Sequence, residues 1–238
     1  RGAEHAPFTL TFIGQYNAGK SSLLAALTGR KDVVIASNVA TTQLATYAWN
    51  GVQLVDTPGV KAGFKQHDAL TGEQIARSDL LVFVTTGELF VEGIADYFRS
   101  LAFSDKRAPE MILVVNKMDR DDASPENKRA NLENVTAPLT LEDFRTVFMS
   151  VENYNDAVAE SDESEQLRLI EKSRMAKFVE ALNGFVRERG SLGRLTTPLH
   201  SIHALASQAA AFCAVDRAEE RTAIELLGLN NYTMRGFS

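Results

Sequence analysis

Hydrophobic and polar positions along the chain predict strands and helices that follow one another in turn. Apolar, β-prone runs with the length of buried strands lie at 8–13, 80–84, 111–115 and 146–149. Helix-forming segments occur between them, at 22–27, 69–77 and 92–103. Strands that alternate with helices favour an α/β fold, with a mostly parallel central sheet flanked by helices.

One pair of strands is expected to be antiparallel. The runs 45–49 and 52–55 flank Asn50-Gly51, a dipeptide that favours the tight turn of a hairpin. The two runs therefore predict an antiparallel hairpin, which we expect at the edge of the sheet.

The second half of the chain is expected to become helical. The acidic run 152–165 predicts a solvated loop and a helix start, and an amphipathic helix follows over 167–189. Glycines and a proline then interrupt the pattern, and from Leu199 the apolar spacing is helical again. We expect one domain over 1–190 and a helical segment over 191–238, which is either part of a stalk or the end of the first domain.

The residues from Gly14 to Ser21 have the pattern G-x-x-x-x-G-K-S, between a predicted strand and a predicted helix. In that context a glycine-rich loop turns its backbone N–H groups around a polyphosphate. Lys20 would reach the terminal phosphates, and the Ser21 hydroxyl would bind Mg²⁺. The candidate nucleotide-binding residues here are Gly14, Gln15, Tyr16, Asn17, Ala18, Gly19, Lys20, Ser21 and Ser22.

A second polar segment, Asp-Thr-Pro-Gly at 56–59, follows the apolar run 52–55. A carboxylate at such a strand end suits an Mg²⁺ site, so Asp56 joins Ser21 as a candidate metal ligand. Gly59 lacks a Cβ and can bring a backbone N–H close to a γ-phosphate. One of the neighbouring Thr41 and Thr42 would close on the metal and the γ-phosphate from the preceding segment.

The strand predicted at 111–115 ends in Asn116-Lys117-Met118-Asp119, an N-K-x-D pattern that indicates guanine recognition. The Asp119 carboxylate can accept two hydrogen bonds from guanine, whereas adenine would leave that buried carboxylate unmatched. The stem of Lys117 can lie along the purine face while its charge stays in water. Asn116 would brace the loop.

These three motifs resemble those of the translation-factor-related class of P-loop GTPases, over about residues 8–152. The Gly-Gln-Tyr-Asn-Ala-Gly-Lys-Ser loop, the Asp-Thr-Pro-Gly-Val turn and the helical tail look most like bacterial dynamin-like proteins. Era-like GTPases share the Asn-Ala-Gly-Lys-Ser core and are the alternative. The resemblance implies hydrolysis of GTP to GDP and phosphate, with Mg²⁺ held by Ser21, Thr42 and Asp56.

Two further roles follow from the resemblance. The phosphate sensor of the relatives is the threonine before a long polar residue, which favours Thr42 over Thr41. The relatives also place a Ser-Ala-Lys-like loop after the strand at 146–149, where a backbone N–H contacts the guanine carbonyl. Ser150 fits that loop, whereas Val151 departs from its pattern, so only a backbone role is implied.

The residues that would drive hydrolysis are less complete. Val60 stands where Ras-type GTPases carry the glutamine that orients the attacking water. In potassium-activated relatives, an asparagine at the position of Asn17 helps to hold K⁺ near the phosphates; otherwise Asn17 only supports the loop. Tyr16 lies close to a position that dynamin relatives use across a G-domain dimer. We therefore expect GTP-dependent pairing of two domains to complete the site.

Composition limits the alternatives. A chain of 238 residues with net charge −6 and a pI near 5.3 is not suited to wide nucleic-acid contact, which makes such a partner unlikely. Cys213 is the only cysteine, so an internal disulfide is excluded. The given residues contain no apolar run of transmembrane length, and we expect no signal peptide. We expect a cytoplasmic protein, and only the resemblance implies peripheral membrane contact.

Three functions remain open. The first is a dynamin-like GTPase that pairs through its G domains and acts on membrane lipid. The second is an Era-like switch that acts on ribosomal RNA or a protein partner. The third is a scaffold that binds GTP with negligible turnover, which the combination of Ser21, Thr42 and Asp56 disfavours.

Overall fold

The computed structural model describes residues 7–29, 44–49, 51–59, 69–86, 93–119 and 125–189. Thr41, Thr42 and Val60 lie outside these ranges, as do all residues from 190 onward. The expected sensor threonine, the boundary at residue 190 and the helical segment 191–238 therefore stay predictions.

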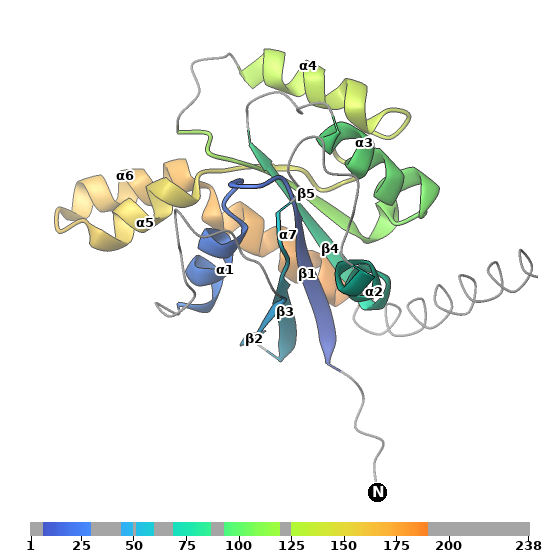
Figure 1. The fold of residues 1–238 in the computed structure, drawn as a ribbon. Helices are drawn as coiled ribbons and strands as arrows, with labels where there is room; N and C mark the ends of the chain where they lie inside the picture. Colours follow the sequence, from blue (N-terminus) through green and yellow to red (C-terminus); the bar gives the residue numbers. More distant parts are fainter. Residues whose placement is uncertain are drawn as a thin grey trace, which may run out of the picture. The chain divides into compact units, whose positions relative to one another are not determined.

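A six-stranded sheet in the order β2-β3-β1-β4-β5-β6 forms the centre of the described part (Figure 1). Its strands are β1 (Phe8–Gly14), β2 (Ala45–Trp49), β3 (Val52–Asp56), β4 (Leu80–Thr86), β5 (Met111–Asn116) and β6 (Val147–Phe148). All neighbouring pairs are parallel except β2 and β3, which form the predicted antiparallel hairpin. The predicted α/β fold with a mostly parallel sheet is confirmed.

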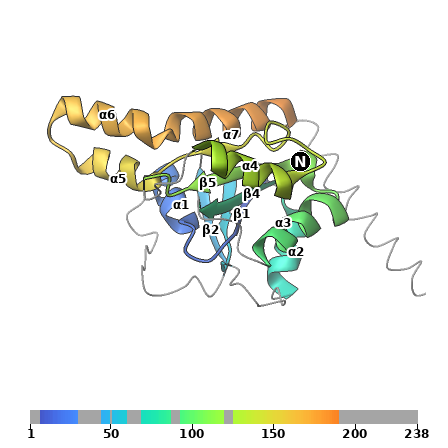
Figure 2. The ribbon, with the colours of Figure 1, turned by 90° about the horizontal axis from the view of Figure 1, so that it is seen from above.

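Helices cover both faces of this sheet (Figure 2). They are α1 (Lys20–Thr28), α2 (Ala69–Arg77), α3 (Ile94–Arg99), α4 (Pro125–Thr136), α5 (Val151–Ala159), α6 (Glu163–Ser173) and α7 (Met175–Arg189). A π-helical turn, Ser100–Ser104, extends α3, and a short 3-10 helix, Ala108–Glu110, precedes β5. Sequence reasoning had not identified α4. None of the described helices is long and apolar enough to cross a membrane.

Alternating side chains of the strands build two cores. On β4, Leu80 and Val82 pack in the cluster that contains α1 and α7. Leu81 and Phe83 point the other way, into the cluster formed with α2, α3 and α4. Because the strands are buried on both faces, they are apolar throughout, as parallel strands covered by helices generally are. The polar residues at the carboxyl ends of these strands therefore lie together on the side of the sheet where the strands end.

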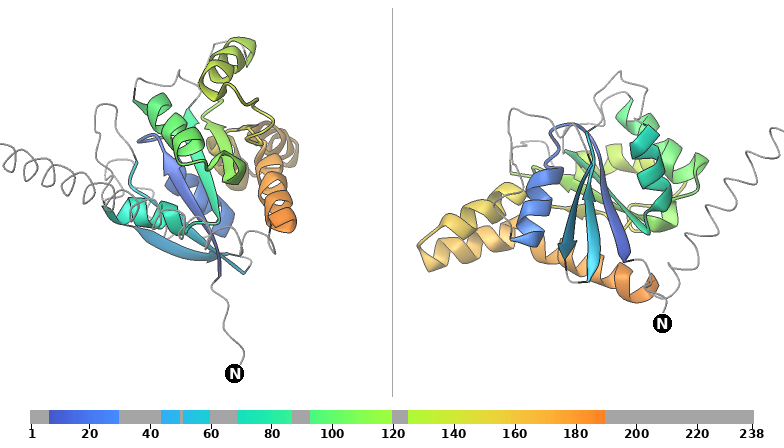
Figure 3. Two further views of the ribbon diagram at one scale, coloured as in Figure 1. Left: turned by 90° about the vertical axis from the view of Figure 1, so that its right-hand side faces the viewer. Right: turned by 60° about the horizontal axis from the view of Figure 1, so that its bottom comes forward.

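The acidic run 152–165 differs in part from the predicted loop and helix start. Residues 152–159 belong to α5, whereas α6 does begin within the run, at Glu163. Ser150 caps α5 by accepting a hydrogen bond from the backbone N–H of Asn153 at 3.1 Å, and Val151 and Ala157 are buried. The carboxylates of the run are solvated as expected. The helix that carries the first of them is stabilised by the Ser150 cap and by burial of Val151 and Ala157. Helices α5 and α6 form a hairpin that projects past α1 (Figure 3).

The single helix predicted over 167–189 is also wrong, because the chain breaks between α6 and α7. Arg174 has a left-handed backbone with φ 55° and ends α6. The buried hydroxyl of Ser173 donates to the Ile170 carbonyl and accepts from the Met175 N–H. The break also lets the Ser173 carbonyl accept from the Ser150 N–H at 3.0 Å. Periodicity alone could not reveal it, since the apolar spacing continues across the break.

Candidate functional site

The phosphate loop connects the end of β1 to α1, as its sequence predicts. The Gln15 N–H donates to the Val84 carbonyl at 3.0 Å, which ties the start of the loop to β4. The Gln15 side-chain oxygen accepts hydrogen bonds from the Thr85 hydroxyl at 3.1 Å and from the Thr86 N–H and hydroxyl at 3.3 Å each. Gln15 therefore anchors the loop with its side chain, a role the motif does not encode.

Lys20 is the first residue of α1, and its side chain is almost fully buried beneath the loop. Its Nζ donates to the carbonyls of Gly14 at 3.3 Å and Gln15 at 2.9 Å. Burial lowers the pKa of Lys20 to about 8, and the nearby Asp56 carboxylate offsets part of that shift. Lys20 is thus held where the loop would surround a phosphate.

Ser21 and Asp56 form the candidate metal site. The Ser21 hydroxyl donates to Asp56 Oδ2 at 2.6 Å, and the Asp56 side chain is buried at the end of β3. Next to it, the Thr57 hydroxyl donates to the Phe12 carbonyl at 2.8 Å and fixes β3 against β1. A hydroxyl and a carboxylate are hard oxygen donors, the type that Mg²⁺ prefers. These residues fit the expected ion.

Gly59 packs directly against the phosphate loop. A Cβ at this position would lie 2.7 Å from Tyr16 Cα and 2.8 Å from Lys20 Nζ. Contacts that short require a shift of backbone or of the buried amine. The close neighbours of Gly59 in this structure are therefore Tyr16 and Lys20, and the approach of its backbone N–H to a γ-phosphate stays a prediction.

The base-reading loop is joined to the phosphate loop through Asn116. This fully buried side chain donates to the Ala18 carbonyl at 2.8 Å and accepts from the Val151 N–H at 3.0 Å. One amide therefore braces two segments, which is the bracing expected of Asn116. Gly19 allows the approach: its φ is 94°, and a Cβ there would lie 2.4 Å from Asn116 Nδ2.

The Ser150 side chain participates in the base-reading end, which the sequence argument did not anticipate. Its hydroxyl donates to a carboxylate oxygen of Asp119 and also caps α5. In the sequence, a serine just before a helical segment with glutamate in its first turn is a recognisable N-cap signal. That pattern could have revealed α5, but not the contact with Asp119.

The structure thus brings most of the predicted residues to one sheet edge. The phosphate loop, Asp56, Gly59 and the N-K-x-D loop meet there, and Ser150 and Val151 adjoin them. Thr41 and Thr42 lie outside the described residues. Asn17 is exposed and has a left-handed backbone with φ 59°, a conformation that asparagine tolerates better than most residues.

Sequence comparisons agree with this arrangement. The profile of 50S ribosome-binding GTPases matches residues 9–117. The chain is 28% identical over 163 residues to GTPase Der of Bacillus cereus and 29% identical to GTPase Der of Bacillus thuringiensis. Each match covers 63% of this chain and 37% of the relative, so the chain spans well under half the length of these curated proteins.

Solved structures with this fold include several GTP-binding proteins. A bacterial dynamin from an oligomerised pair has a TM-score of 0.59 at 16% identity, covering 97% of this chain and 46% of its own. A probable GTP-binding protein engB has a TM-score of 0.53 at 18% identity, covering 76% and 100%. Era bound to MgGDPNP and 16S ribosomal RNA has a TM-score of 0.51 at 19% identity, covering 75% and 56%. The described part of the chain has the fold of a P-loop GTPase domain.

Proposed function

We propose that the chain binds guanine nucleotides and hydrolyses GTP to GDP and phosphate. The observation that carries this proposal is the buried Asn116, which bonds both the phosphate loop and the loop after β6. A nucleotide along this edge would have Lys20 and Ser21 at its phosphates and Asp119 at its base. The distance between the two recognition ends is thereby fixed before any ligand binds.

At the phosphate end, each residue has a separate role. Ser21 and Asp56 would hold Mg²⁺, which neutralises charge on the β- and γ-phosphate oxygens when bound. Lys20 would exchange two neutral carbonyl partners for anionic oxygens, which favours its charged form. Thr42 would complete the metal site from the preceding segment.

At the base end, Asp119 would select guanine by accepting hydrogen bonds from its ring N–H and exocyclic amine. The Ser150 hydroxyl holds one carboxylate oxygen and so orients the acceptor pair. The Val151 N–H already donates to Asn116. The guanine carbonyl would therefore accept from another backbone N–H of this loop, or from Val151 after the loop rearranges.

Two variants test recognition by nucleotide titration. Lys20→Ala should abolish tight GDP and GTP binding. Asp119→Asn should shift the preference from guanine to xanthine nucleotides, because an amide can donate to the xanthine carbonyl. Phosphate release from GTP by the unaltered chain tests the reaction itself. Unchanged guanine selectivity in Asp119→Asn would contradict the base assignment, and binding without turnover would leave a scaffold.

Hydrolysis needs a group to replace the glutamine that Val60 does not supply. Gly59 offers a backbone N–H beside Lys20, and K⁺ held by Asn17 is the proposed source of extra positive charge. The exposed, left-handed Asn17 also has a purely conformational reason to be asparagine. Turnover measured in KCl and again in NaCl decides between these roles, since only an ion ligand predicts a difference.

We further propose the dynamin-like mode, in which two G domains pair across the nucleotide. The absent glutamine and the extent of the bacterial dynamin match, 97% of this chain, support it. Tyr16 is the candidate for the pairing contact, because it lies close to the position that the dynamin relatives use across a G-domain dimer. Turnover per molecule should rise with protein concentration. A constant rate over a thousand-fold dilution, with no GTP-dependent dimer in sedimentation, would reject pairing.

The second candidate is an Era-like switch acting on ribosomal RNA or a protein, in the cytoplasm. The match to the 50S ribosome-binding GTPase profile and the Der relatives support it. Peripheral association with membrane lipid belongs to the dynamin-like mode instead. Two sedimentation experiments in the presence of GTP separate these functions, one with liposomes and one with ribosomal subunits. Association with lipid favours the dynamin-like mode, and association with ribosomal subunits favours the Era-like switch.

A further inference from the structure

A hollow of about 650 Å³ lies next to the base-reading loop, apart from the phosphate loop. It is lined by Met118, Asp119, Arg129, Phe148, Asn153, Arg168, Leu169, Lys172 and Arg174. These residues come from the base-reading loop, α4, β6, α5, α6 and the break between α6 and α7. The volume lies within the range of small-molecule sites. Helices α4, α5 and α6 thus line an open hollow of ligand size.

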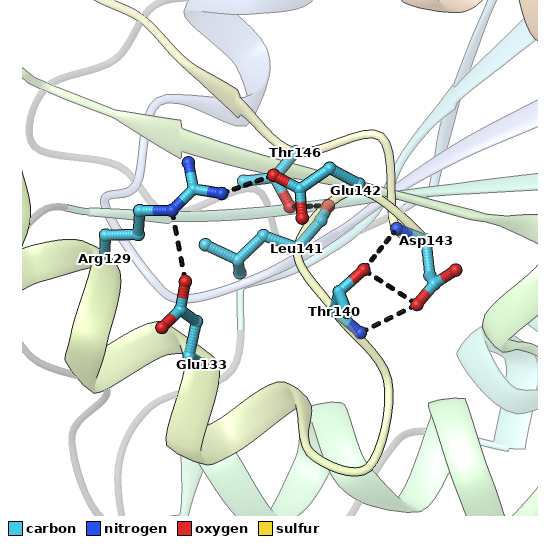
Figure 4. A network of polar contacts seen from close by, with 7 residues as sticks. All are labelled: Arg129, Glu133, Thr140, Leu141, Glu142, Asp143 and Thr146. Carbon is cyan, nitrogen blue, oxygen red and sulfur yellow. Dashed lines mark hydrogen bonds and ion pairs between the residues drawn. The ribbon is translucent and has the colours of Figure 1, made fainter.

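The lining of this hollow combines four cations with one acid. Arg129 is held in an ion pair to Glu133 at 3.1 Å and in a second to Glu142, and these contacts connect α4 to the segment before β6 (Figure 4). Arg168 is paired with Glu165. Much of the charge of these two arginines is therefore already balanced.

Lys172 and Arg174 differ from that pair. Within the described part of the chain, neither side chain forms a hydrogen bond or an ion pair. The pKa of Glu165 is lowered mainly by its hydrogen bond with Arg168 and to a smaller extent by Lys172, so Lys172 acts on that carboxylate only through space. In a chain of net charge −6, these two exposed cations give the wall of one hollow a local positive charge.

A second hollow of about 380 Å³ shares Phe148 and Arg174 with the first. It adds Arg145 and Lys177 as cations and Glu180 as an acid. Arg145 is paired with Glu188 at 2.6 Å, whereas Lys177 has no side-chain partner in the described ranges. Cationic lining therefore continues past Arg174 along the edge strand β6.

We propose that the larger hollow binds a small phosphorylated organic molecule. Lysine and arginine recognise phosphate oxygens, and Met118, Phe148 and Leu169 give the same cavity an apolar wall for a carbon skeleton or ring. Nucleic acid fits less well, because the chain is acidic overall and these cations line two adjoining hollows, which is less than the broad basic face that nucleic acid favours. The hollow lies outside the phosphate loop, since it uses neither Lys20 nor Ser21, but it shares Asp119 with the proposed base-reading loop.

The hollow is also coupled to the base-reading loop. Met118 and Asp119 line it, the Met118 N–H donates to the Met149 carbonyl at 3.2 Å, and the Asp119 carboxylate accepts from Ser150. A ligand here would touch the same loop that reads guanine. By linkage, any change that the ligand makes in nucleotide affinity must be matched by an equal change in its own affinity.

The test uses the full chain with methyl-¹³C methionine, saturated with Mg·GDP so that the phosphate loop is occupied. The Met118 methyl signal is assigned from its loss in Met118→Leu, and its shift is followed during titration with CMP and, separately, with inorganic pyrophosphate. GDP occupancy is checked independently, so a failure of nucleotide binding is recognised as such. We expect saturable shifts of the Met118 signal.

Charge removal gives the decisive comparison. Lys172→Gln combined with Arg174→Gln should weaken binding of the probes at least tenfold. Arg187→Gln, which removes an exposed cation of α7 that lines neither hollow, should leave it unchanged. Tighter binding of CMP than of pyrophosphate supports an organic phosphate, and equal binding supports the phosphate group as the recognised part. No shift of Met118 at 10 mM of either probe (roughly the weak limit of specific affinity), or equal binding by the double variant, would overturn the proposal.

Discussion

The two ends of the candidate nucleotide site are built in different ways. At the phosphate end, a contiguous run of eight residues provides the loop, the lysine and the first metal ligand. At the base end, Asp119 depends on Ser150, which is 31 positions away, and Asn116 reaches Ala18, which is 98 positions away. A contiguous motif can be recognised in the sequence. A site formed by residues from distant segments depends on the positions of helices, which the sequence motif does not specify. Substitutions at the junction of the two ends should therefore have the largest effects.

Among substitutions at this junction, Gly19→Ala should have the largest effect, because it affects both ends at once. The new methyl group would lie 2.4 Å from Asn116 Nδ2, on a backbone with φ 94° that disfavours alanine. We expect GDP affinity to fall by more than about a hundredfold, given that the phosphate loop and its brace are both displaced. Isothermal titration calorimetry measures this loss.

Gly184→Ala is the matched control for that change. Gly184 lies inside α7, and a Cβ there meets only Arg145 Nη1 at 3.8 Å. Alanine should raise the free energy of unfolding by about 0.5–1 kcal/mol through its helix propensity and leave GDP affinity unchanged. Equal GDP affinities in Gly19→Ala and Gly184→Ala would contradict the geometry of the junction.

Asn116→Ala should break the connection while leaving each loop intact. It removes two hydrogen bonds and leaves the Ala18 carbonyl and the Val151 N–H without this partner. Loss of a buried partner costs about 1–3 kcal/mol per group, so we expect a loss of about 3 kcal/mol in the free energy of unfolding. Urea denaturation measures it, with Asn183→Ala on the exposed side of α7 as the control. Equal free energies of unfolding for the two variants would show that the Asn116 hydrogen bonds do not contribute to stability.

The α/β class, the strands and the position of the glycine-rich loop between β1 and α1 followed from the sequence, because strand periodicity and the loop motif act locally. The break at Arg174 did not, since the apolar spacing of 167–189 continues through it. The buried Ser173 favours the interruption between α6 and α7, because its carbonyl accepts a hydrogen bond from the N–H of Ser150, which caps α5. The role of Gln15 escaped for the same reason, as its partners lie on β4. Contacts between distant segments decided these two features, whereas the cap that begins α5 is local to Ser150.

Ser150→Ala should have a smaller effect, confined to the base end. It removes both the cap of α5 and the hydroxyl that holds Asp119. Loss of a cap costs about 1 kcal/mol, and loss of a hydrogen bond to a charged group should weaken GDP binding by roughly tenfold. Asp162→Ala, which removes the cap of α6 and lies away from Asp119, should lower stability to a similar extent without changing GDP affinity. If both variants bind GDP equally well, Ser150 acts only as a cap.

The smallest expected effect concerns the pH dependence at the phosphate end. The pKa of Lys20 is lowered to about 8 in the free chain, and bound phosphates should raise it again, so nucleotide binding takes up a proton above pH 8. From this linkage we expect GDP affinity to be roughly fourfold weaker at pH 8.5 than at pH 7, with uptake of roughly 0.8 proton at the higher pH. Calorimetry in buffers of different ionisation enthalpy measures that uptake directly. Because the same burial penalises charged Lys20, the free chain should gain stability between pH 8 and 10.5, whereas the GDP complex should not. Proton uptake that is absent at pH 8.5 would mean that Lys20 is already fully charged before the nucleotide binds, and that the phosphate end is less desolvated than its burial implies.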